Sequence, residues 1–257
     1  MTVNNITIPA RDGEPLHATW HDGTEIPENR NPVVILCHGF TGNREEWGRF
    51  PAMANALGDA GIDAITFDFT GSGENARTPV TLARQIEDLV DVVDWARQQG
   101  YERIGTLGVS FGGLTSLLAP LPERKVAVFW APAFRMKSAL GNARLISKMK
   151  SLRRSGRPNE INAANGPLIV TASFYEGILN SEALVKPALQ QFTIPALIVQ
   201  GLADHTVRPK RTRNAFRLMP ADDHHKLVEI PGAGHGFDGG QLDRCVSESC
   251  AWFIFYI

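Results

Sequence analysis

Six short apolar runs constrain the fold of this chain more than any other feature. Each run is rich in β-branched or aromatic residues and is bounded by glycine, proline or polar residues, which is typical of buried strands. The runs are PVVILCHGF (32–40), IDAITFDF (62–69), RIGTLGV (103–109), KVAVFWAP (125–132), IPALIVQG (194–201) and HKLVEIPG (225–232). Because these runs are apolar throughout, we expect helices to cover both faces of the sheet that they form.

Helical patterns fill most of the gaps between the runs. Between Thr81 and Gln99, apolar residues recur every three or four positions, and a glycine follows as a stop signal. The segments REEWGRFPAMANALGDAG (44–61) and LDRCVSESCAWFIF (242–255) also fit helices. The first residues, NNITIPARDGEPLHATWHDG (4–23), alternate and contain an Asp-Gly turn, which predicts an antiparallel hairpin at one edge. The sequence therefore predicts an α/β fold with a mostly parallel central sheet flanked by helices.

One stretch interrupts this alternation of strands and helices. Residues 132–193 separate two of the predicted strands and are far longer than an ordinary crossover. We interpret them as an inserted lid after the sixth strand, over one edge of the sheet, and assign residues 1–131 and 194–257 to the core. The first part of the insertion, Arg135 to Arg157, carries eight Lys and Arg residues and no acid. The second part, PLIVTASFYEGIL (167–179), predicts a strand or hairpin.

The composition limits partners and compartment. A net charge of −1 gives no reason to expect nucleic acid or a membrane surface as a partner. The three cysteines are too few for a disulfide framework, and no Cys/His cluster suggests a metal. The N-terminus lacks the pattern of a signal peptide, and the apolar ending AWFIFYI (251–257) is too short to span a bilayer. We therefore expect a cytoplasmic monomer or homodimer that needs no metal or organic cofactor.

A serine between glycines joins the third apolar run to a helical pattern. In GVSFGG (108–113), a tight strand-to-helix turn would expose the hydroxyl of Ser110 above the sheet. Residues two positions to either side of such a serine crowd one another, which explains Gly108 and Gly112. The alternative is a glycine-rich turn with a bystander serine, because short motifs also occur by chance.

An acid and a base follow at the ends of the last two predicted strands. Asp204 lies in a loop after IPALIVQG, and His235 lies in the glycine-rich loop of GAGHGF (232–237). Carboxyl ends of parallel strands meet at one edge of a sheet, so Ser110, Asp204 and His235 can converge there. Other acids and histidines are weaker candidates, because they precede a strand, belong to the hairpin or lie beside the chosen acid or base.

Two backbone N–H groups are needed where the oxyanion of a tetrahedral intermediate forms. One comes from the residue after the serine, which is Phe111. The second would come from Phe40, at the end of the strand that leads into CHGFTGN (37–43). The neighbouring His38 is interpreted as a structural residue that ties this loop through its ring nitrogens.

These motifs resemble those of the α/β-hydrolases. The stretches CHGFTGN, FDFTGSGEN, GVSFGG, LADHTV and GAGHGF are similar to those of bacterial and archaeal serine esterases, a group that includes feruloyl (cinnamoyl) esterases and serine-aminopeptidase-like hydrolases. The resemblance covers the strand ends of nearly the whole core. It implies an α/β-hydrolase fold in which a lid follows the sixth strand.

The predicted function is that of a serine carboxylesterase acting on a small-molecule ester through Ser110, His235 and Asp204. Two alternatives remain at this point. One is a peptidase or amidase with the same triad, in which an acid of the insertion (Glu160, Glu176 or Glu182) would bind a free amino terminus. The other is a non-catalytic binding protein on the same fold.

The basic stretch of the insertion also has two interpretations. It is either a solvated helix face balanced by acids elsewhere or a positive rim that attracts an anionic ester.

Overall fold

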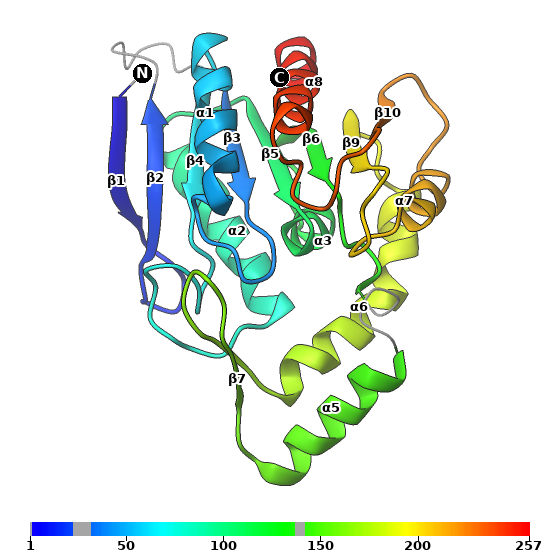
Figure 1. The fold of residues 1–257 in the computed structure, drawn as a ribbon. Helices are drawn as coiled ribbons and strands as arrows, with labels where there is room; N and C mark the ends of the chain where they lie inside the picture. The colour runs from blue at the N-terminus through cyan, green and yellow to red at the C-terminus, as the bar shows by residue number, and fades with distance from the viewer. Residues whose placement is uncertain (1, 23–31, 137–141) are drawn as a thin grey trace.

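A twisted central sheet organises the structure, a computed structural model that describes residues 2–22, 32–136 and 142–257 (Figure 1). The sheet has eight strands in the order β1-β2-β4-β3-β5-β6-β9-β10, and β7 and β8 form a separate two-stranded sheet. The strands are β1 (Thr2–Ile8), β2 (Leu16–Asp22), β3 (Val33–Cys37), β4 (Asp63–Phe67), β5 (Ile104–Val109), β6 (Arg124–Trp130), β7 (Asn159–Ile161), β8 (Leu168–Val170), β9 (Ala196–Gly201) and β10 (His225–Ile230).

The direction of the strands agrees with the sequence prediction. Strand β2 pairs antiparallel with both β1 and β4. From β4 onward through β3, β5, β6, β9 and β10, each strand pairs parallel with the next. The predicted hairpin at one edge of a mostly parallel sheet is therefore confirmed. The carboxyl ends of β3, β5 and β6 point toward the same side of the molecule (Figure 1).

Helices cover both faces of the sheet. The helices of the described residues, some of which lie beyond the ends of the strands, are α1 (Arg49–Asp59), α2 (Leu82–Gln98), α3 (Phe111–Leu118), α5 (Asn142–Ser155), α6 (Ala172–Gln190), α7 (Pro209–Phe216) and α8 (Gly240–Tyr256), with a 3-10 turn η1 (Glu46–Gly48). Helices α1 and α8 lie side by side over one face of the sheet (Figure 1). The predicted segments 44–61, 81–99 and 242–255 thus contain helices.

Burial on both faces explains why the strands are apolar throughout. Alternate side chains of a strand point to opposite faces of its sheet. In β3, Val34 and Leu36 pack into the core beneath α1 and α8. Val33, Ile35 and Cys37 pack into the core beneath α2. Both sets are completely buried, so no position of this strand is left for a polar residue.

The three cysteines are free thiols. Cys37 and Cys245 are buried, and burial raises the pKa of the Cys37 thiol, so Cys37 acts as a packing group. In the part of the chain that the structure describes, no helix is both long and apolar enough to cross a membrane.

The insertion follows β6 and contains α5, β7, β8 and α6. The expectation of a strand or hairpin over residues 167–179 is only partly correct, because α6 begins at Ala172 directly after β8. Phe174, Tyr175 and Ile178 are buried at helical spacing, a pattern too short to distinguish from a strand by sequence. Of the basic stretch, Lys137 lies outside the described residues.

The contacts that bind the insertion to the core include two hydrogen bonds to segments near the predicted site. The amide of Val80 donates to the carbonyl of Ile169 in β8 at 2.9 Å. The side-chain amide of Asn165 donates to the carbonyl of Thr41 at 3.3 Å, in the loop after β3. Helix α5 and strand β7 lie on the side toward which β3, β5 and β6 point (Figure 1). The insertion is therefore on the side of the sheet where the predicted catalytic residues lie.

Candidate active site

Ser110 occupies a strained turn between β5 and α3. Its φ of 51° and ψ of −110° are unfavourable for a residue with a side chain. Backbone hydrogen bonds hold this conformation: the amide of Ser110 donates to the carbonyl of Trp130 at 2.9 Å, and its carbonyl accepts from the amides of Ala133 at 2.8 Å and Gly113 at 3.1 Å. The serine thus sits on the kind of tight strand-to-helix turn that the sequence predicts.

The glycines around the serine are required by close packing of the backbone. A Cβ on Gly108 would lie 2.6 Å from the carbonyl oxygen of Gly112, so these two residues crowd each other as expected. A Cβ on Gly112 would collide with the carbonyl oxygens of Cys37 and His38. Gly112 therefore lets α3 begin directly beside the end of β3.

Asp204 and His235 are hydrogen-bonded to each other. The loop after β9 carries Asp204, the loop after β10 carries His235, and β9 and β10 are parallel neighbours. His235 Nδ1 lies 2.7 Å from Asp204 Oδ2. The other carboxylate oxygen of Asp204 accepts from the amides of Thr206 and Val207, each at 2.8 Å. Asp204 is 2% exposed, so its orientation is fixed by these bonds.

The electrostatics of this pair favour the carboxylate form of Asp204, which orients the imidazole of His235. Burial raises the pKa of Asp204, but the hydrogen bond and charge of His235 and the amide of Val207 outweigh it, so the pKa of Asp204 is lowered. Because a carboxylate only accepts hydrogen bonds, Nδ1 of His235 carries the proton. Its Nε2 is then free to accept a proton from a nucleophile.

Two residues that sequence analysis did not single out support this pair. The buried side-chain amide of Gln200 donates to Asp204 Oδ2 at 3.2 Å, and it is a polar residue near the end of an otherwise apolar strand. A Cβ on Gly201 would collide with the carbonyl oxygens of Ala233 and Gly234, so glycine lets the histidine loop approach the end of β9. The polar Gln200 was a readable signal, whereas the packing of Gly201 was not.

The predicted oxyanion loop passes beside the serine. A Cβ on Gly39 would lie 3.4 Å from Ser110 Cβ. Phe111 is the first residue of α3, and the first amides of a helix have no partner within the helix. The rings of Phe40 and Phe111 pack edge to face with centroids 6.0 Å apart. Both predicted donors therefore belong to segments that adjoin Ser110.

His38 is bound by backbone groups through both ring nitrogens. Its Nε2 accepts from the amide of Phe69 at 3.1 Å, so its Nδ1 carries the proton that binds the carbonyl of Gly39 at 2.8 Å. Burial lowers the pKa of His38, and the ring is neutral. This geometry is that of a structural residue, as the sequence predicts.

Glu46 is a further buried group in this region that the sequence does not reveal. It is 2% exposed, and its Oε2 accepts from the amide of Gly39 at 3.0 Å. Arg49 lies 3.4 Å from its other oxygen and also donates to the carbonyl of Gly236 at 3.0 Å. Glu46 and Arg49 thus link the loop after β3 to the loop that carries His235. Nothing in the segment REEW distinguishes Glu46 from its exposed neighbour Glu45.

The buried carboxyl of Glu46 predicts a pH-dependent stability. Burial raises the pKa of Glu46 to about 7, against an ordinary value of 4.5, although Arg49 and the Gly39 amide partly oppose the rise. The folded state therefore holds this proton more tightly than the unfolded state. The associated stability is fully present below pH 4.5 and is lost as the pH rises through 7.

We expect Glu46→Gln to lack this loss. Between pH 4.5 and 8 its free energy of unfolding should rise relative to wild type by about 3 kcal/mol. Urea unfolding of both proteins at several pH values measures the difference, with Glu45→Gln as the matched exposed control. A constant difference between Glu46→Gln and wild type across this range would contradict the assignment.

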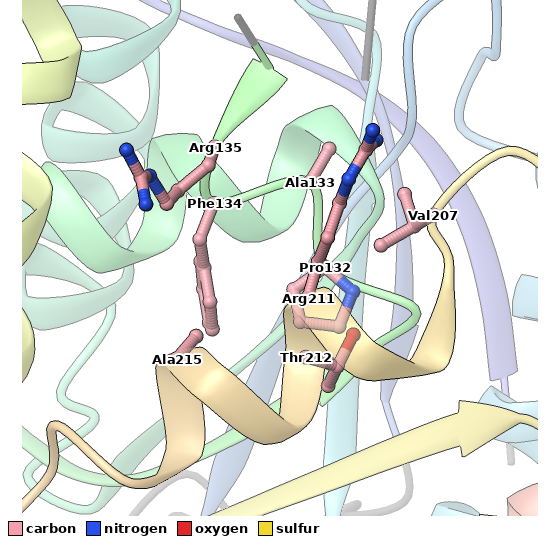
Figure 2. Close-up of a pocket in the computed structure, with 8 residues that line it drawn as sticks. All are labelled: Pro132, Ala133, Phe134, Arg135, Val207, Arg211, Thr212 and Ala215. Carbon is pink, nitrogen blue, oxygen red and sulfur yellow. The ribbon is translucent and has the colours of Figure 1, made fainter. Parts of the chain in front are cut away.

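The cavities near the site differ in size. Figure 2 shows one of about 10 Å³ between the segment after β6 and helix α7, with Arg211 between Ala133 and Val207. This volume holds about one water molecule, so it is too small for a substrate. A second cavity, of about 320 Å³, is lined by Phe40 and by residues of α5, β7 and α6. Of these two cavities, the second reaches the size of a small-molecule site, about 300–1,000 Å³.

The structure thus brings the predicted residues together in two groups. It brings Asp204 and His235 into contact and sets the Phe40 loop against Ser110. Among the described residues, no hydrogen bond joins the Ser110 hydroxyl to His235, and such bonds are often long before substrate binds. The catalytic roles of these residues stay predictions. The described residues also contain no group of three or more His, Cys, Asp or Glu side chains that could hold a metal ion.

Two proteins with related sequences match part of the chain. An uncharacterized 31.7 kDa protein from the traX-finO intergenic region of Escherichia coli is 42% identical over 108 residues, 39% of this chain and 37% of that protein. Epoxide hydrolase B of Mycobacterium tuberculosis is 32% identical over 87 residues, 34% of this chain and 24% of that protein. The chain therefore aligns with well under half the length of either relative.

Solved structures match nearly the whole chain. Est1E from Butyrivibrio proteoclasticus, solved with ferulic acid bound, has a TM-score of 0.75 at 24% identity, covering 97% of this chain and 98% of Est1E. Hypothetical protein PA2218 from Pseudomonas aeruginosa has a TM-score of 0.81 at 18% identity, covering 100% of this chain and 94% of that one. These similarities show the fold. The model of the alpha/beta hydrolase family matches residues 34–244, which are most of the chain. The chain belongs to the alpha/beta hydrolase family.

Proposed function

We propose that this protein is a serine hydrolase that cleaves carboxylic esters through an acyl-enzyme intermediate. The observation that carries the proposal is the 2.7 Å hydrogen bond between Asp204 and His235. It leaves Nε2 of His235 available as a base, at the same edge of the sheet as the strained turn that carries Ser110. Membership of the alpha/beta hydrolase family supports hydrolysis as the reaction.

In the proposed mechanism, His235 Nε2 takes the proton of the Ser110 hydroxyl as its oxygen attacks the ester carbonyl. Asp204 holds the imidazole and stabilises its cation. The amides of Phe40 and Phe111 bind the oxyanion, and each donor contributes about 3 kcal/mol in comparable sites. His235 then gives its proton to the departing alcohol. Water attacks the acyl group through the same base and releases the acid and free Ser110.

The similarity to an epoxide hydrolase raises a second reaction class. If Ser110 opened an epoxide, the product would be an ether, which has no carbonyl for water to attack. A carboxylate nucleophile would instead form an ester that water can cleave. The turn between β5 and α3 carries a serine and not a carboxylate, so its chemistry favours carbonyl substrates over epoxides.

A peptidase or amidase with the same triad is the remaining enzymatic alternative. It would need an acid that is free to bind the amino terminus of a substrate. Glu176 and Glu182 pair with Arg153 and Arg135 at 2.7 and 3.0 Å. These ion pairs reduce the availability of the two glutamates for an amine, which favours the ester over the amide.

The ester assignment predicts a clear order of rates. We expect kcat/KM for p-nitrophenyl acyl esters to exceed that for aminoacyl p-nitroanilides by at least about a hundredfold, because Glu176 and Glu182 are already paired with arginines. Both substrate series release a chromophore that is followed by absorbance, so they can be compared in one assay. Styrene oxide tests the epoxide alternative. Faster turnover of the anilides or of the epoxide would replace the ester assignment.

A further inference from the structure

The cavity of about 320 Å³ adjoins the predicted oxyanion hole. Phe40, whose amide is one predicted oxyanion donor, is also one of the residues that line this cavity. A substrate group in the cavity would therefore contact the same residue that binds the reacting carbonyl. The remaining walls come from α5, β7 and the first turn of α6, all parts of the insertion.

One side of the cavity is aromatic. The ring of Phe40 stacks on that of Phe174 with centroids 5.2 Å apart, and Phe174 packs edge to face against Tyr175 at 5.3 Å. Leu145 of α5 adds an aliphatic surface. Such a wall suits an aromatic ring or a short alkyl chain.

Two cations also line the cavity. Arg144 and Lys148 both line it, four residues apart on α5, so they lie one turn apart on the same helix face. Burial raises the pKa of the Tyr175 hydroxyl, and the charge of Arg144 partly opposes the rise. The guanidinium of Arg144 therefore lies close to the aromatic wall. Within the described ranges, neither cation forms an ion pair with an acid of the protein.

Other charges of the insertion are already engaged or point elsewhere. Arg135 pairs with Glu182, and Arg153 pairs with Glu176. On β7, Asn159 and Ile161 line the cavity, and side chains alternate along a strand, so the intervening Glu160 points away from it. The positive charge at the cavity is therefore not balanced by the nearest acids of the insertion.

We propose that this cavity binds the end of a substrate that carries a carboxylate, held by Arg144 and Lys148, with the apolar part of the same group against Phe40 and Phe174. The inference rests on the proposed ester hydrolysis. The planar guanidinium of Arg144 matches a carboxylate with two parallel hydrogen bonds, and Lys148 adds a point charge. The substrate class is accordingly an ester of a dicarboxylic acid or of a hydroxy acid.

Two matched ester pairs test the proposal. The p-nitrophenyl monoester of glutaric acid is compared with its neutral carboxamide analogue, and 3-acetoxybenzoate is compared with 3-acetoxybenzamide. The first pair puts the charge on the acyl part, and the second puts it on the alcohol part. In wild type, kcat/KM should be higher for the anionic member of at least one pair, and this preference should weaken with added salt.

Substitutions on α5 locate the effect. Arg144→Gln should lower the anionic-to-neutral ratio of kcat/KM about tenfold, Lys148→Gln should lower it less, and Arg144→Glu should reverse the preference. Lys150→Gln is the matched control, because Lys150 is exposed on the same helix, does not line the cavity and lies two residues from Lys148. Equal ratios in Arg144→Gln and Lys150→Gln, or a wild type that prefers the neutral ester of both pairs, overturn the proposal.

Binding without turnover separates this inference from the proposed function. Calorimetric titration with 3-phenylpropionate and with 3-phenylpropanamide requires no catalysis. The carboxylate should bind wild type more tightly than the amide, and Arg144→Gln should raise its Kd about tenfold. If no ester is cleaved but this difference is found, ester hydrolysis fails and the carboxylate site stands. If neutral esters are cleaved but binding does not depend on Arg144, the carboxylate site fails and ester hydrolysis stands.

Discussion

Replacing Ser110 by alanine is expected to lower kcat/KM for p-nitrophenyl esters by at least about 10⁴-fold. Loss of the nucleophile removes the acyl-enzyme route and leaves only the contributions of binding and the oxyanion hole. The substitution removes one oxygen, and the backbone bonds that hold the turn involve only main-chain atoms of Ser110, so the fold should be kept. Steady-state kinetics and circular dichroism together measure the two outcomes.

Covalent labelling provides an independent measurement of the same serine. A fluorophosphonate probe should add one mass increment to wild type and none to Ser110→Ala, since phosphonylation needs an activated hydroxyl. Ser247→Ala is the matched control, because Ser247 is an exposed serine of α8. Labelling of Ser110→Ala would move the nucleophile elsewhere, and an unlabelled wild type would favour a binding protein on this fold.

The second large effect is expected for Asp204→Asn, which should lower kcat by about 10³- to 10⁴-fold. The carboxylate of Asp204 accepts the Nδ1 proton of His235 and so keeps Nε2 free to act as a base. An amide can present its NH₂ group to the ring instead, which stabilises the tautomer with the proton on Nε2. Kinetics with the preferred ester measure the loss. Asp238→Asn is the control, since Asp238 is exposed and lies only three residues from His235.

The same substitution should change stability in a pH-dependent way. Because the pKa of Asp204 is lowered in the folded state, its contribution to stability is present above its ordinary pKa of 3.8 and is lost as the pH falls through the folded value. Asp204→Asn should therefore be less stable than wild type at neutral pH, and the difference should shrink in acid.

In the activity assay, an active Asp204→Asn variant together with an inactive Asp238→Asn variant would reassign the acid.

The sequence predicted those parts of the fold that depend on local pattern. The strands are continuous apolar runs because both of their faces are buried, as Val34 and Leu36 on one face and Val33 and Ile35 on the other illustrate. The loops of Ser110, Asp204 and His235 were predictable because parallel strands end at a common edge. For Asp204 and His235, the structure adds the contact between them that the sequence could only imply.

Features that depend on contacts between distant segments were not predictable. Glu46 is buried because the loop after β3 folds back so that its carboxylate meets the amide of Gly39, while the chemically identical Glu45 stays in solvent. The start of α6 is predicted as extended structure because its first buried residues, Phe174 and Tyr175, follow β8 after only three intervening residues. Charge composition likewise could not show which cations of the insertion find acidic partners.

The two hydrogen bonds from Val80 to Ile169 and from Asn165 to Thr41 bear on how this protein could be re-engineered. They bind the insertion to the core at β8 and at the turn before it. Helix α5, which supplies cavity residues, precedes both of these bonds in the chain. Randomising α5 should therefore change which esters are accepted while the turn at Ser110 and the Asp204–His235 pair stay as they are. Exchange of the whole insertion with that of another hydrolase would instead need to preserve both attachments to keep the loop after β3 in place.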